Sequence, residues 1–315
     1  MTFGRVNMRE SAKSIAREIF NLLLLLFSAS ALLLLASRWA REIAELGFFG
    51  MRTAVTVIIP SVFPFMVLSD IIRSTVDFSA LRRSGAFLRR LIGIGGGELC
   101  AYILGSIAGF PVGAIAVRES YLGGDLDRRE AERLVAISSV PSLSFTVAGV
   151  GSAIHGSAAV GLALYFSVIA SSMIYALLTK RASSTVDRTP KGRPRWNLSR
   201  SIDSASKASL GIIATVTLFS VISGLISSCG LPDFLNSALL MLLELSSACL
   251  QFAENTPASL LATAFSLGFC GLSVHIQIRG ILADTDLRYL PFLTAKLVMG
   301  LITATIFSSL WLFIK

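Results

Sequence analysis

The sequence contains many long apolar runs, and these limit its fold more than any other feature. A helix that crosses a hydrocarbon core about 30 Å thick needs about 20 consecutive, mostly apolar residues. Only 15% of the residues are charged, whereas soluble domains carry about 25%. The runs cover about Ile19–Ser37, Phe48–Ile72, Leu99–Val117, Leu134–Val150, Ser157–Leu178, Ala208–Ser227, Ser237–Phe252, Ser259–Ile278 and Tyr289–Ile314. Because not every run needs to span, we predict an all-α polytopic membrane protein with about eight membrane segments, which excludes a peripheral or singly anchored protein.

Charge and cysteine placement narrow the class further. The 28 Lys and Arg against 19 Asp and Glu give a net charge of +9, and in a membrane chain such an excess indicates loop orientation rather than a nucleic-acid surface. The four cysteines lie in or beside apolar runs, without CxxC or Cys/His spacing. We therefore expect no nucleic-acid partner, no disulfide scaffold, no metal site and no cofactor.

The sequence divides into four parts. Residues 1–47 are expected to hold a retained anchor helix and a connector, because the first apolar run exceeds the roughly 7 to 15 residues of a signal-peptide core. Residues 48–178 and 208–315 are predicted to be two transporter or gate halves. Between them, residues 179–207 are rich in Lys and Arg and contain Pro190 and Pro194, which predicts a flexible cytoplasmic loop. Binding of this loop to anionic lipid is an open alternative.

The two halves resemble weak copies of each other. Val57–Ile72 resembles the segment around Val216–Ser223, and these stretches are expected to run in opposite directions if the N-terminus is cytoplasmic. A second match lies after the two interrupted runs. Asp125 and Leu126 follow Arg118 at the same spacing as Asp286 and Leu287 follow Arg279. We therefore predict an inverted repeat around a midplane site, as in many secondary transporters. Chance similarity between apolar segments is the alternative.

The run Leu99–Val117 is interrupted by glycine and proline. Gly109, Pro111 and Gly113 break the helix where hydrocarbon cannot satisfy backbone N–H and C=O groups, so the break must face protein, water or a ligand. This pattern predicts a substrate-binding segment, and close helix packing through the GxxxG spacing that begins at Gly105 is the alternative. If this run spans, the charged loop Arg118–Arg133 changes side and the parity of the basic loop suffers, whereas a re-entrant run restores the parity.

A second interrupted run carries four different polar groups within a short stretch. These are Ser273, His275, Gln277 and Arg279. Polar groups at membrane depth need partners, so all four are predicted to bind substrate. Arg279 could instead reach the membrane boundary along its aliphatic stem, and the same alternative applies to Arg118.

A third interruption places hydroxyls around Pro141. Ser138, Ser139 and Ser142 are predicted to line the substrate site, with a proline kink as the structural alternative.

Ionisable groups near the apolar runs are candidates for coupling or ion pairing. They are Asp70, Glu244 and Arg118, and Glu244 lies deepest within its run.

Enzymatic motifs are weak. Gly271-Leu-Ser273 fits a loose GxSx pattern, but no histidine follows His275 and His155 precedes the serine. The sequence has no HExxH motif and no P-loop, so we expect no enzymatic activity.

Several of these motifs together resemble the YlbJ-type sporulation integral membrane proteins, also called the stage V sporulation SpoVV family, which carry a nucleoside recognition or gate domain. The resemblance rests on Pro60–Asp70, Gly109–Gly113 followed by Glu130–Arg133, Phe219–Ile222 and Gly271–Gln277. It covers most of the chain. The segment Ser138–Ser142 departs from an Asn-Asn-Ser-Gly-Pro type sequence expected of the family, which leaves the substrate open.

The resemblance implies a multi-pass fold related to concentrative nucleoside transporters, in the bacterial cell membrane, that moves dipicolinic acid during sporulation. We therefore predict alternating-access transport of a small organic anion. The alternatives are a transporter of nucleosides or other small solutes and a non-transporting membrane assembly factor. Homo-oligomer formation is left open.

Overall fold

The computed structural model describes residues 23–30, 37–75, 93–94, 96–180 and 197–314, and all regular secondary structure within them is helical. The chain forms two compact units, Met1–Leu46 and Gly47–Lys315. In the first unit, residues 23–30 and 37–46 are helical. The rest of the predicted anchor helix, and residues 181–196 of the predicted basic loop, lie outside the described residues. The larger unit contains every site discussed below.

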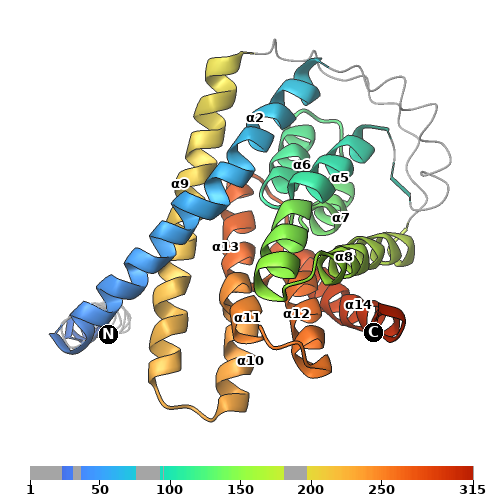
Figure 1. Cartoon of the computed structure of the whole chain (residues 1–315). Helices are drawn as coiled ribbons and strands as arrows, with labels where there is room; N and C mark the ends of the chain where they lie inside the picture. Colours follow the sequence, from blue (N-terminus) through green and yellow to red (C-terminus); the bar gives the residue numbers. More distant parts are fainter. Residues whose placement is uncertain (1–22, 31–36, 76–92, 95, 181–196, 315) are drawn as a thin grey trace, which may run out of the picture. The chain divides into compact units, whose positions relative to one another are not determined.

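The first half of the larger unit contains a bent helix, a helical hairpin, a broken helix and a long helix. Its elements are η1 (Ala54–Ile58), α2 (Ile59–Thr75), α5 (Gly96–Ala108), α6 (Val112–Leu122), α7 (Arg128–Ser138), η2 (Phe145–Ile154) and α8 (Ala158–Leu178). The widened π turn η1 directly precedes Pro60, whose missing N–H disturbs regular α hydrogen bonding. α5 and α6 pack against each other as a hairpin (Figure 1). The run Leu99–Val117 therefore turns back on itself, as the re-entrant alternative requires.

The second half repeats this order of elements. They are α9 (Leu198–Ser228), α10 (Asp233–Leu243), α11 (Leu245–Gln251), α12 (Pro257–Phe269), α13 (Gly271–Ile281) and α14 (Tyr289–Ile314). α9 begins before the predicted start at Ala208. The Asn197 side chain caps it by accepting hydrogen bonds from the backbone N–H groups of Ser199 and Arg200, so the last part of the predicted loop is helical.

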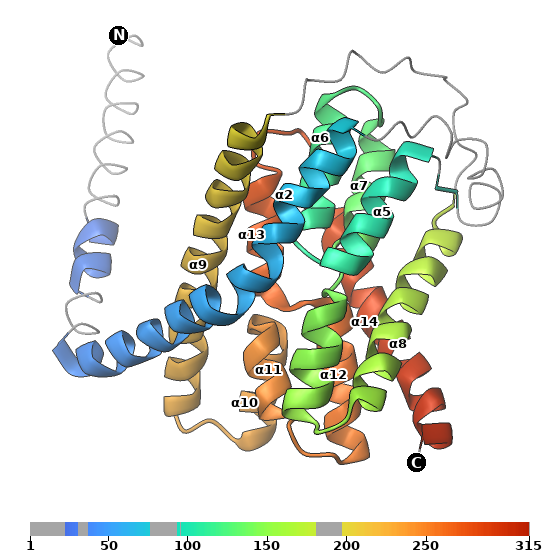
Figure 2. The ribbon, with the colours of Figure 1, turned by 45° about the horizontal axis from the view of Figure 1, so that its top comes forward.

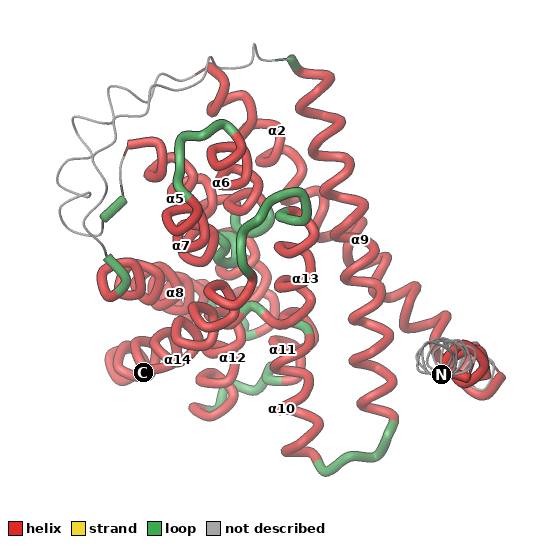
Figure 3. Tube along the Cα trace, turned by 180° about the vertical axis from the view of Figure 1, so that it is seen from behind, coloured by secondary structure: helices red, strands yellow, loops and turns green. Residues whose placement is uncertain are grey.

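The long helices of the two halves pack in antiparallel pairs. α2 packs against α9, and Gly50, which precedes η1, lies so close to α9 that an added Cβ would be 2.6 Å from Ser220 Cβ. α8 crosses α14 where Thr303 Oγ1 donates a 2.8 Å hydrogen bond to Ser171 Oγ. Figure 3 shows α8, α12 and α14 side by side. Their contact forms a buried core that includes Leu164 and Met299.

Two pairs of loops close opposite ends of the larger unit (Figure 2). The ionic end comprises loop 123–127, between α6 and α7, and loop 282–288, between α13 and α14. The amide end comprises loop 155–157, between η2 and α8, and loop 252–256, between α11 and α12. Side-chain interactions described below join α6 and α7 to loop 282–288 at the ionic end and join the two loops at the amide end.

The match between the segments after Arg118 and Arg279 was predicted to support an inverted repeat, and this prediction is wrong. Arg118 and the segment after Arg279 meet at the ionic end, because the Arg118 guanidinium pairs with Asp284. Inverted copies would place these segments at opposite ends. An arginine at the end of an apolar helix, followed by an acidic loop, is favoured by solvation alone and so recurs without duplication.

Four described helical segments are long and apolar enough to cross a membrane. They are Ala158–Leu178, Leu198–Ser228, Pro257–Ile281, which joins α12 and α13, and Tyr289–Phe313. Shorter apolar helices occur at Glu98–Ala108, Phe145–Ile154 and Asp233–Leu243. This count is lower than the eight predicted segments because helix breaks divide several apolar runs into pieces shorter than a membrane span.

Candidate functional site

The first helix break lies at the tip of the α5–α6 hairpin and is closed by backbone contacts. Gly109 has φ +78°, and the N–H of Phe110 donates a 2.8 Å hydrogen bond to the carbonyl of Val140. An added Cβ would lie 2.1 Å from the Ser138 carbonyl oxygen at Gly105 and 2.2 Å from it at Gly113. Only glycine permits this approach, so Gly105 and Gly113 serve the close packing that the sequence left as an alternative.

The second break separates α7 from η2. The Ser138 hydroxyl donates back to the carbonyl of Leu134, whereas the Ser142 hydroxyl accepts a 3.1 Å hydrogen bond from the N–H of Phe145. Ser142 therefore caps the helical segment that leads into η2. The carbonyl of Ser139 accepts a hydrogen bond from the ammonium of Lys296 on α14.

The third break separates α12 from α13 at two consecutive left-handed residues. Cys270 has φ 73° and Gly271 has φ 69°, and Cys270 is the only non-glycine residue with positive φ in the described part of the chain. The buried His275 ring holds this break, since its Nε2 is 2.9 Å from the Phe269 carbonyl and its Nδ1 is 2.9 Å from the Tyr289 hydroxyl. His275 therefore satisfies the end of α12.

A fourth break, between α10 and α11, was not predicted. Glu244 is only 5% exposed, and its carboxylate accepts a 2.5 Å hydrogen bond from the N–H of Ser247. The carboxylate thereby caps α11. The sequence signal was an acidic residue followed within three positions by serines, inside an otherwise apolar run.

Tips and edges of all four breaks line one cavity of about 350 Å³. Five predicted site residues meet there: Pro111, Ser142, Glu244, Ser273 and Gln277. The remaining wall is largely apolar and includes Val62 from α2, Val216 from α9, and two aromatic residues from the breaks, Phe110 and Phe145. We call this space the central cavity.

The electrostatic character of the central cavity follows from its helix ends. The first turns of α6, η2 and α13 reach it, through Pro111, Ser142 and Ser273 respectively. Helix N-termini carry partial positive charge and unpaired N–H groups, so together they favour an anion. Glu244 contributes the opposite charge, and Gln277 offers an amide that can donate or accept.

Other predicted site residues lie outside this cavity. Gly109, Gly113, Ser138, Ser139 and His275 pack behind the breaks and do not line it. Their contacts support the backbone that forms the cavity wall. Asp70 belongs to α2, but its side chain lies outside what the structure describes.

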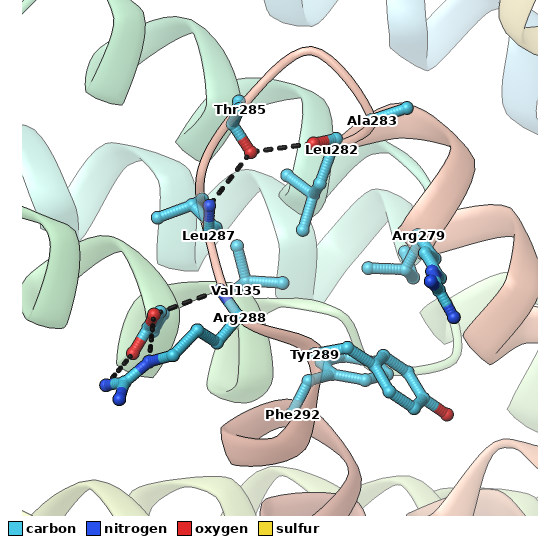
Figure 4. Close-up of a pocket in the computed structure, with 11 residues that line it drawn as sticks. Val135, Arg279, Leu282, Ala283, Thr285, Leu287, Arg288, Tyr289 and Phe292 are labelled. Carbon is cyan, nitrogen blue, oxygen red and sulfur yellow. Dashed lines mark hydrogen bonds and ion pairs between the residues drawn. The ribbon is translucent and has the colours of Figure 1, made fainter. Parts of the chain in front are cut away.

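The predicted arginines lie toward the ionic end. Arg279 lines a second cavity of about 270 Å³, and its guanidinium carbon lies 5.8 Å from the centre of the Tyr289 ring (Figure 4). Arg118 Nε donates a 2.8 Å hydrogen bond to Asp284, which lowers the pKa of that carboxyl below its ordinary value. Arg118 thus joins the end of α6 to loop 282–288 and does not reach the central cavity.

Further ion pairs hold the ionic end closed. Glu132 is 6% exposed and accepts 3.0 Å hydrogen bonds from both the backbone N–H and the guanidinium of Arg288. Both residues line the second cavity, and Figure 4 shows Arg288 there. Arg128 connects Glu132 to Asp286, which also accepts a hydrogen bond from the Tyr121 hydroxyl. The network therefore connects the start of α7 with loop 282–288.

The amide end is closed by a neutral pair. His155 Nδ1 is 2.9 Å from Asn255 Oδ1, and the Asn255 amide donates a 3.2 Å hydrogen bond to the His155 carbonyl. Burial is the main cause that lowers the pKa of His155 below its ordinary value, although the hydrogen bond with Asn255 opposes this shift. His155 is therefore a structural link between loops 155–157 and 252–256.

Lys296 is the important residue that sequence reasoning missed. It is the only charged residue of α14 and is fully buried. A single lysine in the middle of an apolar run was a signal comparable to Glu244, because an intramembrane charge is expensive unless it has a role.

These features define a multi-pass integral membrane protein with an internal cavity between broken helices. The chain is 28% identical to the sporulation integral membrane protein YlbJ of Bacillus subtilis (strain 168), over 311 aligned positions that cover 81% of this chain and 74% of that protein. This similarity confirms the predicted resemblance to YlbJ-type sporulation integral membrane proteins. No family model matches the chain, and no solved structure gives a significant match.

Proposed function

We propose that this protein is a membrane transporter that moves a small organic anion by alternating access, without enzymatic chemistry. The observation that carries this proposal is the central cavity, where the N-terminal ends of α6, η2 and α13 converge on a space of about 350 Å³. Discontinuous helices with N-termini aimed at an anionic group are the arrangement expected of a transporter site.

We also propose that the two halves form an inverted repeat that rocks around this cavity. The order of long helix, hairpin, broken helix and long helix is shared, and α2 packs antiparallel to its counterpart α9. In this correspondence α5–α6 matches α10–α11, and α7–η2 matches α12–α13. The ionic end and the amide end would then be the two gates that open in turn.

The proposed cargo is a dicarboxylate such as dipicolinic acid, moved during sporulation. The cargo and its setting come from the family resemblance, and the helix N-termini are compatible with them. Glu244 lines the same cavity, so its side chain would lie beside a cargo bound there. We therefore propose Glu244 as the residue that couples an ion to cargo binding. Asp70 and Arg118 were the other coupling candidates, and Arg118 is already committed to Asp284.

A nucleoside is the second candidate cargo. The hydroxyls of Ser142 and Ser273, the amide of Gln277 and the aromatic wall at Phe110 and Phe145 suit a neutral polar ring as well. The two cargos differ in charge, so they can be separated by competition.

The decisive test is uptake of labelled dipicolinate, with uridine as comparison, into proteoliposomes that contain purified protein. Gln277→Ala should reduce dipicolinate uptake, because Gln277 lines the cavity, whereas Gln251→Ala should not, because Gln251 lies exposed at the end of α11. Uridine uptake that dipicolinate fails to inhibit would replace the anion by a nucleoside. Folded protein that transports neither would contradict both cargos and favour a non-transporting assembly factor.

A further inference from the structure

We infer that Lys296 supplies a buried positive charge that makes the central cavity prefer anions over neutral molecules of the same shape. The inference rests on the proposed function and names the residue that determines its specificity. Lys296 does not line the cavity, so its role would be electrostatic and positional rather than direct contact.

Among the described residues, no carboxylate forms an ion pair with Lys296. Its ammonium donates to the carbonyl of Ser139, lies beside the Cys270 thiol and is 5.6 Å from the centre of the Phe292 ring. Among the carboxylates that the structure describes, none lies within the 4.0 Å limit of an ion pair with it. Glu132 is buried but has two arginine partners, and the exposed Lys207 is paired with Asp203. Lys296 differs from both.

The position of Lys296 connects it to the cavity. Its ammonium contacts residue 139, three positions before Ser142, and residue 270, three positions before Ser273. Ser142 and Ser273 both line the central cavity. Because three residues reach at most about 11 Å when fully extended, the ammonium lies directly behind two of the breaks that form the cavity wall.

An anion in the cavity would complete the charge balance around Lys296. A buried ammonium is unfavourable unless opposite charge compensates it, and the C-terminal dipole of α7 at Ser139 gives only partial compensation. Charges interact more strongly across a poorly solvated protein interior than across water. Lys296 and the three helix N-termini would therefore act together on the cargo, from opposite sides of the broken backbone.

The test compares acids with their neutral amides on the purified full-length protein in lipid nanodiscs. The probes are pyridine-2,6-dicarboxylate with pyridine-2,6-dicarboxamide, and benzoate with benzamide. Lys296→Gln removes the charge but keeps a donor for the Ser139 carbonyl, Lys296→Arg keeps the charge, and Lys207→Gln is the control at an exposed lysine. We expect Lys296→Gln to weaken binding of the acids about tenfold, equivalent to about 1.4 kcal/mol, while binding of the amides changes less than about twofold. The Arg variant and the Lys207 control should keep the preference for acids.

Each outcome bears on the inference. Equal losses for acid and amide in Lys296→Gln, or no loss for the acid, would overturn it, because a purely structural lysine affects both probes alike. A preference for benzoate over benzamide that Lys296→Gln abolishes would support the inference even if the dicarboxylate fails to bind. In that case only the proposed cargo would be contradicted. If Lys296→Gln does not fold, the test compares the wild-type protein with Lys296→Arg. A ratio of acid affinity to amide affinity below about threefold in either protein would overturn the inference.

Discussion

The two halves of the larger unit share an order of elements but stabilise their helix breaks by different means. In the first half, the α5–α6 tip packs backbone against backbone, with Gly105 and Gly113 in contact with the Ser138 carbonyl. In the second half, polar side chains complete the breaks, since Glu244 caps α11 and His275 satisfies the Phe269 carbonyl. The first half thus depends on the absence of side chains, and the second half depends on particular ones.

This difference assigns separate tasks to the two halves. The first half contributes rigid, closely packed backbone and helix N-termini to the central cavity. The second half contributes the carboxylate of Glu244 and the amide of Gln277, whereas both halves contribute serine hydroxyls, such as those of Ser142 and Ser273. In a transporter with this division, a change of cargo would require substitutions mainly in the second half.

The largest predicted effect is on stability and tests backbone packing in the first half. Gly113→Ala places a Cβ 2.2 Å from the Ser138 carbonyl oxygen, so α6 and α7 must separate. We expect a loss of about 3 kcal/mol in the free energy of unfolding, measured by reversible denaturation in mixed micelles. Gly280→Ala in α13 is the control, because no heavy atom lies within 4 Å of its new Cβ. Equal stabilities of the two variants would refute the close approach.

The next effect tests side-chain support in the second half. His275→Leu leaves the buried Phe269 carbonyl without a donor, so we expect a loss of about 2 kcal/mol in the free energy of unfolding. His275→Gln keeps a donor and should recover part of this loss. If Leu and Gln are equally destabilising, the hydrogen bond to Phe269 does not hold the break, and packing of the ring among Phe269 and Phe292 does.

A smaller effect tests the contact between the halves at the ionic end. Glu132→Gln removes the carboxylate that accepts from Arg288 and Arg128, and we expect a loss of about 1.5 kcal/mol in the free energy of unfolding, reduced by high salt. Glu254→Gln at the amide end is the control, since Glu254 is exposed and has no described partner. A loss of stability that salt does not change would show that packing, rather than charge, joins α7 to loop 282–288.

The smallest effect separates the two ends by their response to acid. Burial lowers the pKa of His155 in the folded protein, so the unfolded chain binds a proton at this residue more readily. The contribution of neutral His155 to the free energy of unfolding is therefore complete above about pH 6.5 and is lost as the pH falls. The hydrogen bond from Arg118 lowers the pKa of Asp284 below 3.8, so its contribution is lost only in stronger acid. Acidification from about pH 7 to about pH 5 should therefore lower the amide protection factors, which correct for the intrinsic pH dependence of exchange, in loop 155–157 but not in loop 282–288.

A matched variant checks the origin of this acid response. His155→Gln can still bond Asn255 but does not titrate near neutral pH, so the amide protection factors at the amide end should become independent of pH in this range. If the dependence persists in His155→Gln, another group controls that end.

Glycine and proline patterns located most of the breaks correctly. The interruptions expected near Gly109, Pro141 and Gly271 are present, because proline removes a donor and glycine permits positive φ wherever it occurs. Side-chain roles were harder to predict. His275 and Arg279 are near neighbours in sequence, yet His275 supports a break and Arg279 lines the second cavity. Position along a helix does not reveal what packs against each face.

The sequence by itself determined the class of protein and three of the four places where the helices around the central cavity break. Apolar run length and the restricted backbone of glycine and proline are local properties, and they act in the same way in any surroundings. Only the tertiary structure decided that Pro111, Glu244 and Gln277 share one cavity, and that Lys296 lies behind it. Those contacts join residues far apart in the chain, and no local preference encodes which apolar helices meet, because their surfaces are chemically alike.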